Sequence, residues 1–266
     1  MDPSLIDQPV HSANPVLRFH SVTKTFSRKG RPDFTAVDHV SFDLMPGECL
    51  GIIGESGSGK STIANIAVRL LNATEGQVFL DGEDITVVKG GDLRRIYRKI
   101  QMVFQMPTES FDPRRTLGDG IGESLRNMGM SRKEAEREVE GLLGLCHLEP
   151  EFAARYPHQV SGGQCQRAAI ARALAVKPKV LICDEATSAL DVTIQKEIME
   201  LLGELRRQRG EGLSILFISH DIALVQQFCS RILVMHKGRI VEEGDPGEII
   251  RNPKDAYTRR LIDSIL

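Results

Sequence analysis

The sequence predicts an α/β fold in which a mainly parallel sheet is covered by helices on both faces. Short apolar segments alternate with helical patterns along most of the chain, which is typical of a sheet buried on two sides. Two polar motifs directly follow apolar segments, where a parallel sheet presents its carboxyl-terminal edge. The apolar strands are expected at residues 49–53, 101–104, 179–183, 214–218 and 231–235.

The remaining elements are predicted from periodicity and from helix-end signals. Residues 16–22 and 40–44 alternate between apolar and polar side chains, as half-buried strands do, and residues 78–80 form a further strand. Helices are expected at residues 60–71 and 162–175, and another helix leads from the 179–183 strand to about residue 209. The helical pattern between residues 117 and 159, with a capping box at Ser131 and Glu134, indicates an inserted lobe.

The composition is that of an ordinary globular protein. Charged residues make up 26% of the 266 residues and the net charge is −2, so no basic surplus points to a nucleic-acid partner. Residues 1–15 are polar and lack the pattern of a signal peptide, so we interpret them as a flexible tail on a cytoplasmic protein. The five cysteines have neither metal-site nor disulfide spacing and are expected to be buried and reduced: Cys49, Cys146, Cys165, Cys183 and Cys229.

The segment GESGSGKS at residues 54–61 fits the pattern of a phosphate-binding loop. Glycines allow backbone N–H groups to wrap around a phosphate chain, and the following helix points its positive end at that chain. Lys60 is expected to reach the β- and γ-phosphates of a nucleotide, and the Ser61 hydroxyl is expected to ligate Mg²⁺. The predicted ATP-binding residues of this segment are Gly54, Glu55, Ser56, Gly57, Ser58, Gly59, Lys60, Ser61 and Thr62.

Two carboxylates stand where the 179–183 strand ends. Asp184 is expected to hold Mg²⁺, and Glu185 is expected to orient and polarise an attacking water molecule. This pattern is weak alone, since strands often end in Asp or Glu. Together with the phosphate-binding loop, it predicts ATP hydrolysis.

A third segment, VSGGQ at residues 160–164, precedes a helix. Ser161 and Gln164 fit a capping box, which many helices have. Gly162 and Gly163 are not needed for such a cap and weaken a first helical turn, but they let a phosphate approach the bare helix N-terminus. The segment therefore has a structural and a nucleotide-binding interpretation.

With these three segments in this order, the chain resembles the nucleotide-binding domains of ABC transporters from about residue 16 to residue 266. The sequence VSGGQCQR stands where that family has its signature, with Val160 in place of the commoner leucine. The resemblance implies a phosphate-loop NTPase core, an N-terminal antiparallel β subdomain, an inserted α-helical subdomain at about residues 107–175, and a short C-terminal extension at about residues 245–266.

The resemblance also implies roles for residues outside the three segments. Gln105 matches the glutamine that senses the γ-phosphate and its metal, and His220 matches the switch histidine. Residues 188–191, ending in Asp191, match the D-loop, and Phe26 stands where the family often stacks an aromatic ring on adenine. In the mechanism implied by the family, two subunits share each ATP, and the signature residues act on the partner's ATP: Ser161, Gly162, Gly163 and Gln164.

Residues 105–116, 184–195 and 252–259 resemble the branch of the family that imports peptides or nickel. That branch implies ATP and Mg²⁺ as cofactors, a second ATPase subunit that is identical or different, and two membrane permease subunits. It also implies an extracytoplasmic substrate-binding protein as an indirect partner, and a peripheral location on the cytoplasmic face of the inner membrane. Residues 106–116 are expected to contact the permeases through an exposed Phe111, with a core position for Phe111 as the alternative.

Other classes of protein share parts of this pattern. Chromosome-maintenance ATPases split the same head with long coiled coils, and the stretch between Lys60 and Ser161 shows no sustained heptads. Translation factors of the family carry two heads, and this chain has one. An ATP-binding subunit of a related complex, such as one for phosphonate breakdown, stays open, and the sequence does not decide between peptide and nickel as cargo.

Overall fold

The computed structural model describes residues 14–27, 30, 32–187 and 190–264, and its first layer is a four-stranded antiparallel sheet. The strand order in this sheet is β2-β1-β4-β5. Of the tail expected at residues 1–15, only Asn14 and Pro15 belong to the described part, so that expectation lies almost entirely outside it. The strands are β1 (Leu17–Phe26), β2 (Phe34–Leu44), β4 (Glu75–Leu80) and β5 (Glu83–Asp84).

The second layer is a six-stranded sheet in the order β10-β9-β3-β8-β7-β6. Five of these strands run parallel, and only β10 pairs in the antiparallel direction, on β9 at the edge. This confirms the predicted mainly parallel sheet. The strands are β3 (Cys49–Ile53), β6 (Ile100–Val103), β7 (Val180–Asp184), β8 (Ser214–Ile218), β9 (Arg231–His236) and β10 (Arg239–Gly244).

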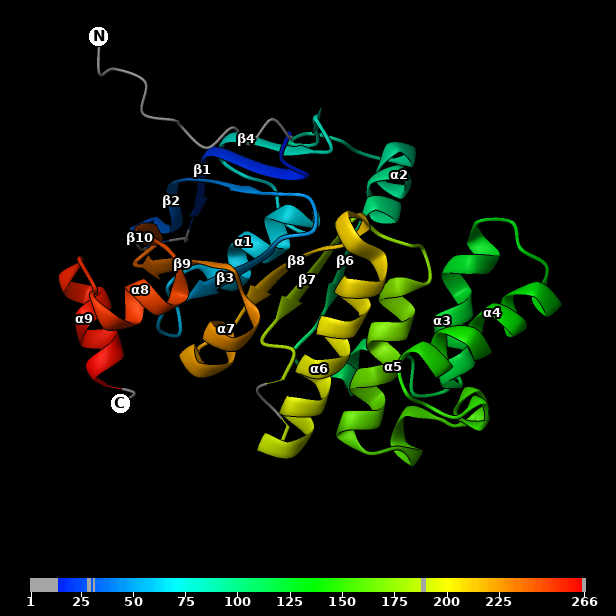
Figure 1. Ribbon diagram of the computed structural model, residues 1–266. Helices are drawn as coiled ribbons and strands as arrows, with labels where there is room; N and C mark the ends of the chain where they lie inside the picture. The colour runs from blue at the N-terminus through cyan, green and yellow to red at the C-terminus, as the bar shows by residue number, and fades with distance from the viewer. Residues whose placement is uncertain (1–13, 28–29, 31, 188–189, 265–266) are drawn as a thin grey trace, which may run out of the picture.

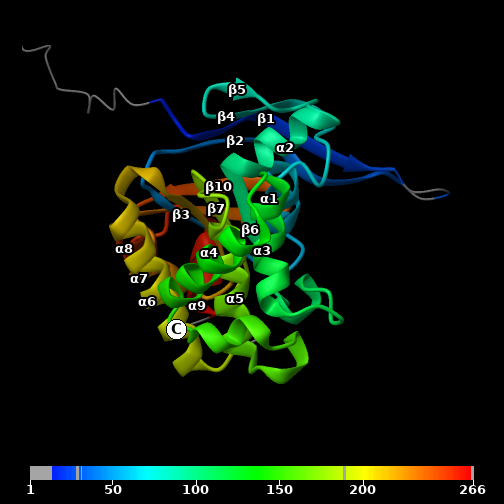
Figure 2. The same ribbon diagram turned by 90° about the vertical axis from the view of Figure 1, so that its right-hand side faces the viewer.

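Helices complete the molecule on both sides of the six-stranded sheet. Figure 2 shows the antiparallel sheet above the six-stranded sheet and α5, α6 and α7 below it. Figure 1 shows α3 and α4 standing at one end, on the far side of α5 from the antiparallel sheet. The α-helices are α1 (Lys60–Ala67), α2 (Gly91–Lys99), α3 (Leu117–Asn127), α4 (Arg132–Leu145), α5 (Gly162–Leu174), α6 (Val192–Arg209), α7 (Ile222–Phe228), α8 (Pro246–Arg251) and α9 (Ala256–Asp263). Short 3₁₀ helices are η1 (Pro107–Ser110), η2 (Pro150–Ala154), η3 (Pro157–Gln159) and η4 (Gly210–Gly212).

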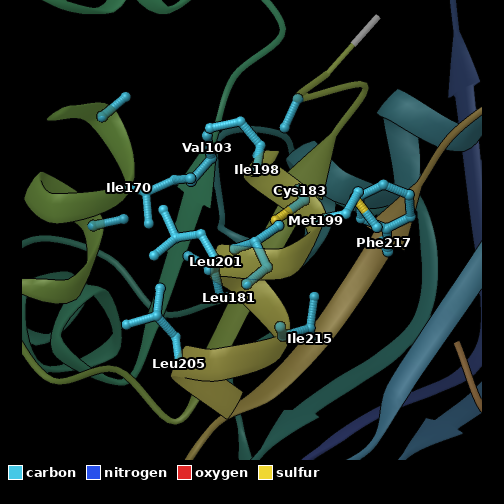
Figure 3. Packing of buried hydrophobic residues seen from close by; sticks show 14 of the residues in the cluster. Val103, Ile170, Leu181, Cys183, Ile198, Met199, Leu201, Leu205, Ile215 and Phe217 are labelled. Atoms are coloured by element: carbon cyan, nitrogen blue, oxygen red, sulfur yellow. The ribbon is translucent and has the colours of Figure 1, made fainter. Parts of the chain in front are cut away.

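The continuous apolar strands are explained by burial on both faces. Along β7, Leu181 and Cys183 point into the core formed with the helices, whereas Val180 and Ile182 point into the core shared with the antiparallel sheet. Figure 3 shows the first of these cores, in which side chains of β6, β7 and β8 meet those of α5 and α6. The second core includes apolar residues of both sheets and of α1, so α1 is held between the two sheets.

The ends of several helices follow from side-chain caps that the sequence predicts. Ser131 and Glu134 form the expected capping box at the start of α4, because each accepts a hydrogen bond from the other's backbone N–H. The first helix is shorter than expected: α1 ends at Ala67, and Arg69 takes a left-handed backbone conformation with φ 61°. The helices α2, α8 and α9 and the strand β10 are elements that the sequence analysis missed.

The cysteines confirm the expectation for reduced thiols. All five are free and buried, and burial raises the pKa of Cys146 to about 12 and of Cys165 to about 11. Within the described residues, no helix has the length and apolar character required to cross a bilayer.

Phe111 corrects the prediction of an exposed docking side chain. It is 5% exposed and belongs to the core of helices α3 to α5. The guanidinium of Arg172 lies over its ring, 4.4 Å from the centroid, and a Cβ at Gly120 would come within 2.7 Å of the same ring. The large apolar side chains exposed near this segment are Phe104 and Met106, which are 38% and 50% exposed.

Replacing Phe111 by alanine is therefore expected to destabilise the protein by about 3–5 kcal/mol, because a buried ring is lost and a cavity remains. Met106→Ala is the matched control and is expected to stay within about 0.5 kcal/mol of the wild type, since the side chain is half in solvent. Denaturant unfolding of both variants measures the two free energies. Equal stabilities would contradict the core position of Phe111.

Candidate active site

The candidate site lies at the carboxyl-terminal edge of the six-stranded sheet. The phosphate-binding loop follows β3, His220 comes shortly after β8, and Asp184 ends β7. These three strands are direct neighbours in the order β3-β8-β7 and run in the same direction. Sheet topology therefore brings together residues that stand more than a hundred positions apart in the chain, as expected for a ligand site of an open α/β sheet.

Close backbone neighbours require a glycine at two positions of the loop. Gly54 and Gly59 have φ values of 148° and 109°, which disfavour any other residue. A Cβ at Gly54 would come within 2.2 Å of the Met235 carbonyl oxygen, and one at Gly59 within 2.2 Å of the Ala36 carbonyl oxygen. The loop is thus held between the end of β9 and strand β2. Gly57 also has a positive φ, of 80°, but faces open space.

Lys60 begins helix α1 and folds back over the loop. Its Nζ donates to the carbonyl oxygens of Gly54 and Glu55, at 2.7 and 2.9 Å. The residue is 5% exposed. Burial lowers the pKa of the Lys60 ammonium, while the carboxylates of Glu185 and Asp184 act in the opposite direction. A positive charge held in a desolvated loop is suited to an anionic ligand.

Ser61 and Asp184 bring two hard oxygen atoms close together. The Ser61 hydroxyl donates to Asp184 Oδ1 at 3.1 Å. Burial raises the pKa of Asp184, and the hydrogen bond from Ser61 opposes that rise. Within the described residues, no group of three or more His, Cys, Asp or Glu side chains is arranged for a metal. A hydroxyl and a carboxylate oxygen fit Mg²⁺, which usually keeps water and phosphate ligands beside one or two protein oxygens.

Glu185 and His220 lie beside this pair. Glu185 is in the left-handed backbone region, with φ 47°, while its N–H donates to the Ile218 carbonyl of β8 at 2.9 Å. Its carboxylate lies 3.7 Å from His220 Nδ1, and the two side chains are 22% and 62% exposed. A partly buried carboxylate next to an exposed imidazole can hold and orient a water molecule.

Gln105 follows strand β6, and Phe26 is the last residue of β1. Gln105 is exposed and follows β6 by two residues, so it stands at the same sheet edge as Asp184. Phe26 is half-buried at the end of β1, with the Lys24 ammonium 5.0 Å from its ring centroid. Its pairing partner Phe34 lies two residues from Ala36, whose carbonyl contacts the loop.

The signature segment starts helix α5, and its two glycines differ. Ser161 Oγ accepts from the Gln164 N–H at 3.3 Å, and the Ser161 N–H donates to Gln164 Oε1 at 2.9 Å. Gly163 is buried against α6, where a Cβ would come within 2.5 Å of Ile194 Cγ2. Gly162 is exposed, and a Cβ there would meet only the tip of Leu190 at 3.4 Å. Packing against α6 therefore explains why residue 163 is a glycine, whereas packing does not require a glycine at residue 162.

The predicted D-loop is only partly described. Ser188 and Ala189 lie outside the described residues. Asp191 caps helix α6, because its Oδ1 accepts from the Ile194 N–H at 3.0 Å.

Tyr257 is a site neighbour that the sequence analysis did not assign to the site. Its hydroxyl oxygen accepts a hydrogen bond from the Glu55 N–H of the phosphate-binding loop, at 3.0 Å. The only sequence signal was the resemblance of residues 252–259 to one branch of importers, which gave no role to the tyrosine.

Comparison with protein families and curated proteins gives concordant matches. The family model described as ABC transporter matches residues 37–188. The glutathione import ATP-binding protein GsiA of Shigella dysenteriae is 45% identical over 99% of this chain, and that of Pectobacterium atrosepticum is 46% identical over 97%. This chain spans 43% and 42% of those two proteins, which is less than half of their length.

Solved structures support the same fold. The dimeric ATP-binding cassette MJ0796, in a post-hydrolysis state with ADP and Pi, superposes with a TM-score of 0.79 and 33% identity. That match covers 86% of this chain and 98% of the cassette. A subunit of the ABC transporter complex cbiONQ from Clostridium perfringens gives a TM-score of 0.78 at 27% identity, over 95% of this chain and 99% of its own.

The different surroundings of the two signature glycines predict different costs for alanine. Gly163→Ala is expected to destabilise the protein by about 1–3 kcal/mol through overpacking against Ile194. Gly162→Ala is expected to change stability little, because the position is exposed and alanine favours a helix. Thermal unfolding of the pair tests this difference, and a greater loss for Gly162→Ala would refute it.

Proposed function

Because this chain belongs to the ABC transporter family, we propose that it binds and hydrolyses ATP to energise an importer of peptides or peptide-like cargo. The observation that carries the proposal is the convergence of Lys60, Ser61, Asp184 and Glu185 at one sheet edge. The relatives described above are named for import of glutathione, itself a small peptide, and they favour a peptide over nickel.

The roles of the site residues follow from their chemistry. The loop N–H groups and Lys60 bind the phosphates of ATP, and Ser61 and Asp184 hold Mg²⁺, which neutralises charge on those phosphates. Glu185 polarises the attacking water, and His220 and Gln105 border the γ-phosphate. Phe26 lies beside adenine. The shared orientation of β3, β7 and β8 supports these roles, because it directs the groups to one point.

A second copy or a related ATPase completes each site. Ser161, Gly162 and Gln164 begin α5. The first N–H groups of a helix have no backbone acceptor within it, so those that the Ser161–Gln164 capping box does not engage suit a phosphate held by the opposite subunit. Asp191 lies at that same interface. The exposure of Gly162 supports this role, and the solved cassette MJ0796 is itself a dimer.

The remaining partners are two membrane permeases and, through them, an extracytoplasmic substrate-binding protein. We place the subunit on the cytoplasmic face of the inner membrane. Phe104 and Met106, which flank Gln105 in sequence, are the apolar side chains available for contact with a permease, in place of the buried Phe111. The inserted helical subdomain then comprises residues 107–175, and residues 245–266 form the C-terminal extension.

Lys60→Ala is expected to weaken ATP affinity about 10- to 100-fold, because a charged hydrogen-bond donor to the phosphates is lost. Lys89→Ala, at an exposed lysine outside the loop, serves as the control. Equilibrium binding of ATP to both folded variants measures the effect. If Lys60→Ala binds ATP as the wild type does, the assignment of the loop fails.

Glu185→Gln is expected to keep ATP affinity while slowing hydrolysis about 10²- to 10⁴-fold, because the amide does not act as a base toward water. The ATP-bound dimer should then accumulate, because the ATP that bridges the two subunits is not hydrolysed. Single-turnover kinetics and size-exclusion chromatography with ATP and Mg²⁺ measure these effects. The exposed Glu200 of α6 gives the control Glu200→Gln, and normal hydrolysis by Glu185→Gln would exclude the catalytic role.

A further inference from the structure

We propose that Tyr257 of the C-terminal helix α9 is a positioning residue for the phosphate-binding loop. Its hydroxyl oxygen accepts a hydrogen bond from the Glu55 N–H at 3.0 Å and so sets the orientation of the peptide group that supports Lys60. The inference rests on the proposed function, because the effect is expected in the handling of ATP.

One peptide group links Tyr257 to Lys60. The Glu55 N–H and the Gly54 carbonyl belong to the same planar peptide unit and point in opposite directions. The N–H end is held by Tyr257, and the carbonyl end accepts from Lys60 Nζ at 2.7 Å. Lys60 is thus connected to the C-terminal helix through a single rigid group.

This peptide group needs an anchor because of the residue before it. Gly54 has φ 148° and no Cβ of its own to restrict its backbone torsions, although the Met235 carbonyl oxygen packs against it on one side. Rotation of the Gly54–Glu55 peptide would withdraw the carbonyl from Lys60 and turn an N–H toward the ammonium. The hydrogen bond to Tyr257 opposes that rotation.

Tyr257 is held by two direct contacts, and the start of its helix is held by a third. Its ring, in a residue that is 5% exposed, stacks on His236 at the end of β9, with 3.8 Å between centroids. Its N–H donates to Asp255 Oδ1 at 2.7 Å, which caps α9. The carboxylate of Glu242 in β10 accepts from the N–H groups of Lys254 and Asp255, at 2.9 and 3.1 Å. Contacts with β9 and β10 therefore fix the position of the Tyr257 hydroxyl.

Tyr257 and Lys60 therefore hold opposite ends of the same peptide group, and only Lys60 is needed by the nucleotide. When Lys60 turns from the two carbonyls to phosphate oxygens, the Gly54–Glu55 peptide keeps its orientation because Tyr257 still holds the N–H. A loop without this hydrogen bond samples other orientations, and ATP binding must then restore the productive one. The penalty falls on ATP affinity and KM, whereas the groups that act on water stay unchanged.

The test is Tyr257→Phe, which removes the hydroxyl and keeps the ring on His236. Its KM and Kd for ATP are expected to rise about 2- to 10-fold, as for loss of one hydrogen bond, with kcat and Tm close to the wild type. Tyr97→Phe, which removes a hydroxyl from helix α2, is the matched control and should leave both constants unchanged.

Three outcomes would contradict parts of the proposal in distinguishable ways. An unchanged KM and Kd in Tyr257→Phe would overturn the positioning role. A fall in Tm that accounts for all lost activity, with KM unchanged in the folded fraction, would overturn it in favour of a purely structural hydroxyl. Absence of ATP hydrolysis in the wild type would instead refute the proposed function on which the inference rests.

Discussion

Burial of the six-stranded sheet on both faces is the constraint on which the site depends. Because each central strand contributes side chains to two cores, polar groups are excluded from the strands and appear where the strands end. Parallel direction then gathers those ends at a single edge. Lys60 follows the end of β3, whereas Asp184 and Glu185 stand at the end of β7. Strand β8 lies between these two strands, and apolar side chains of all three pack in the same two cores.

Lys60 and Asp184 carry opposite charges, and each favours the charged form of the other. Desolvation lowers the pKa of Lys60 and raises that of Asp184, so burial alone would favour the neutral form of each. Their mutual attraction, together with the Ser61 hydrogen bond to Asp184, favours the charged forms. A bound anion and cation would satisfy the same charges more fully, which gives the loop a physical reason to bind the two together.

Much of the fold and of the central motifs was predictable because the determining patterns are local. The glycine-rich loop, the Asp184-Glu185 strand end and the Ser131 and Ser161 caps are contained within a few residues each. Phe111 was not predictable, because its polar neighbours in sequence conceal the contact with Arg172 and Gly120. Helix α2 was missed because Ile96 is its one buried residue, and the contact of Tyr257 with Glu55 was missed because it spans about two hundred positions. The contact of Gly163 with Ile194 depends on how two helices cross, which no short pattern records.

The backbone of Glu185 has a consequence for how such a chain could change over time. A glutamate with φ 47° costs about 1 kcal/mol relative to a glycine in the same conformation, and the hydrogen bond to Ile218 in β8 holds it there. Selection for stability alone would therefore favour glycine at this position, which would relax the strain and remove the carboxylate. At residue 185, backbone stability and the carboxylate beside His220 therefore make opposite demands on the choice of amino acid.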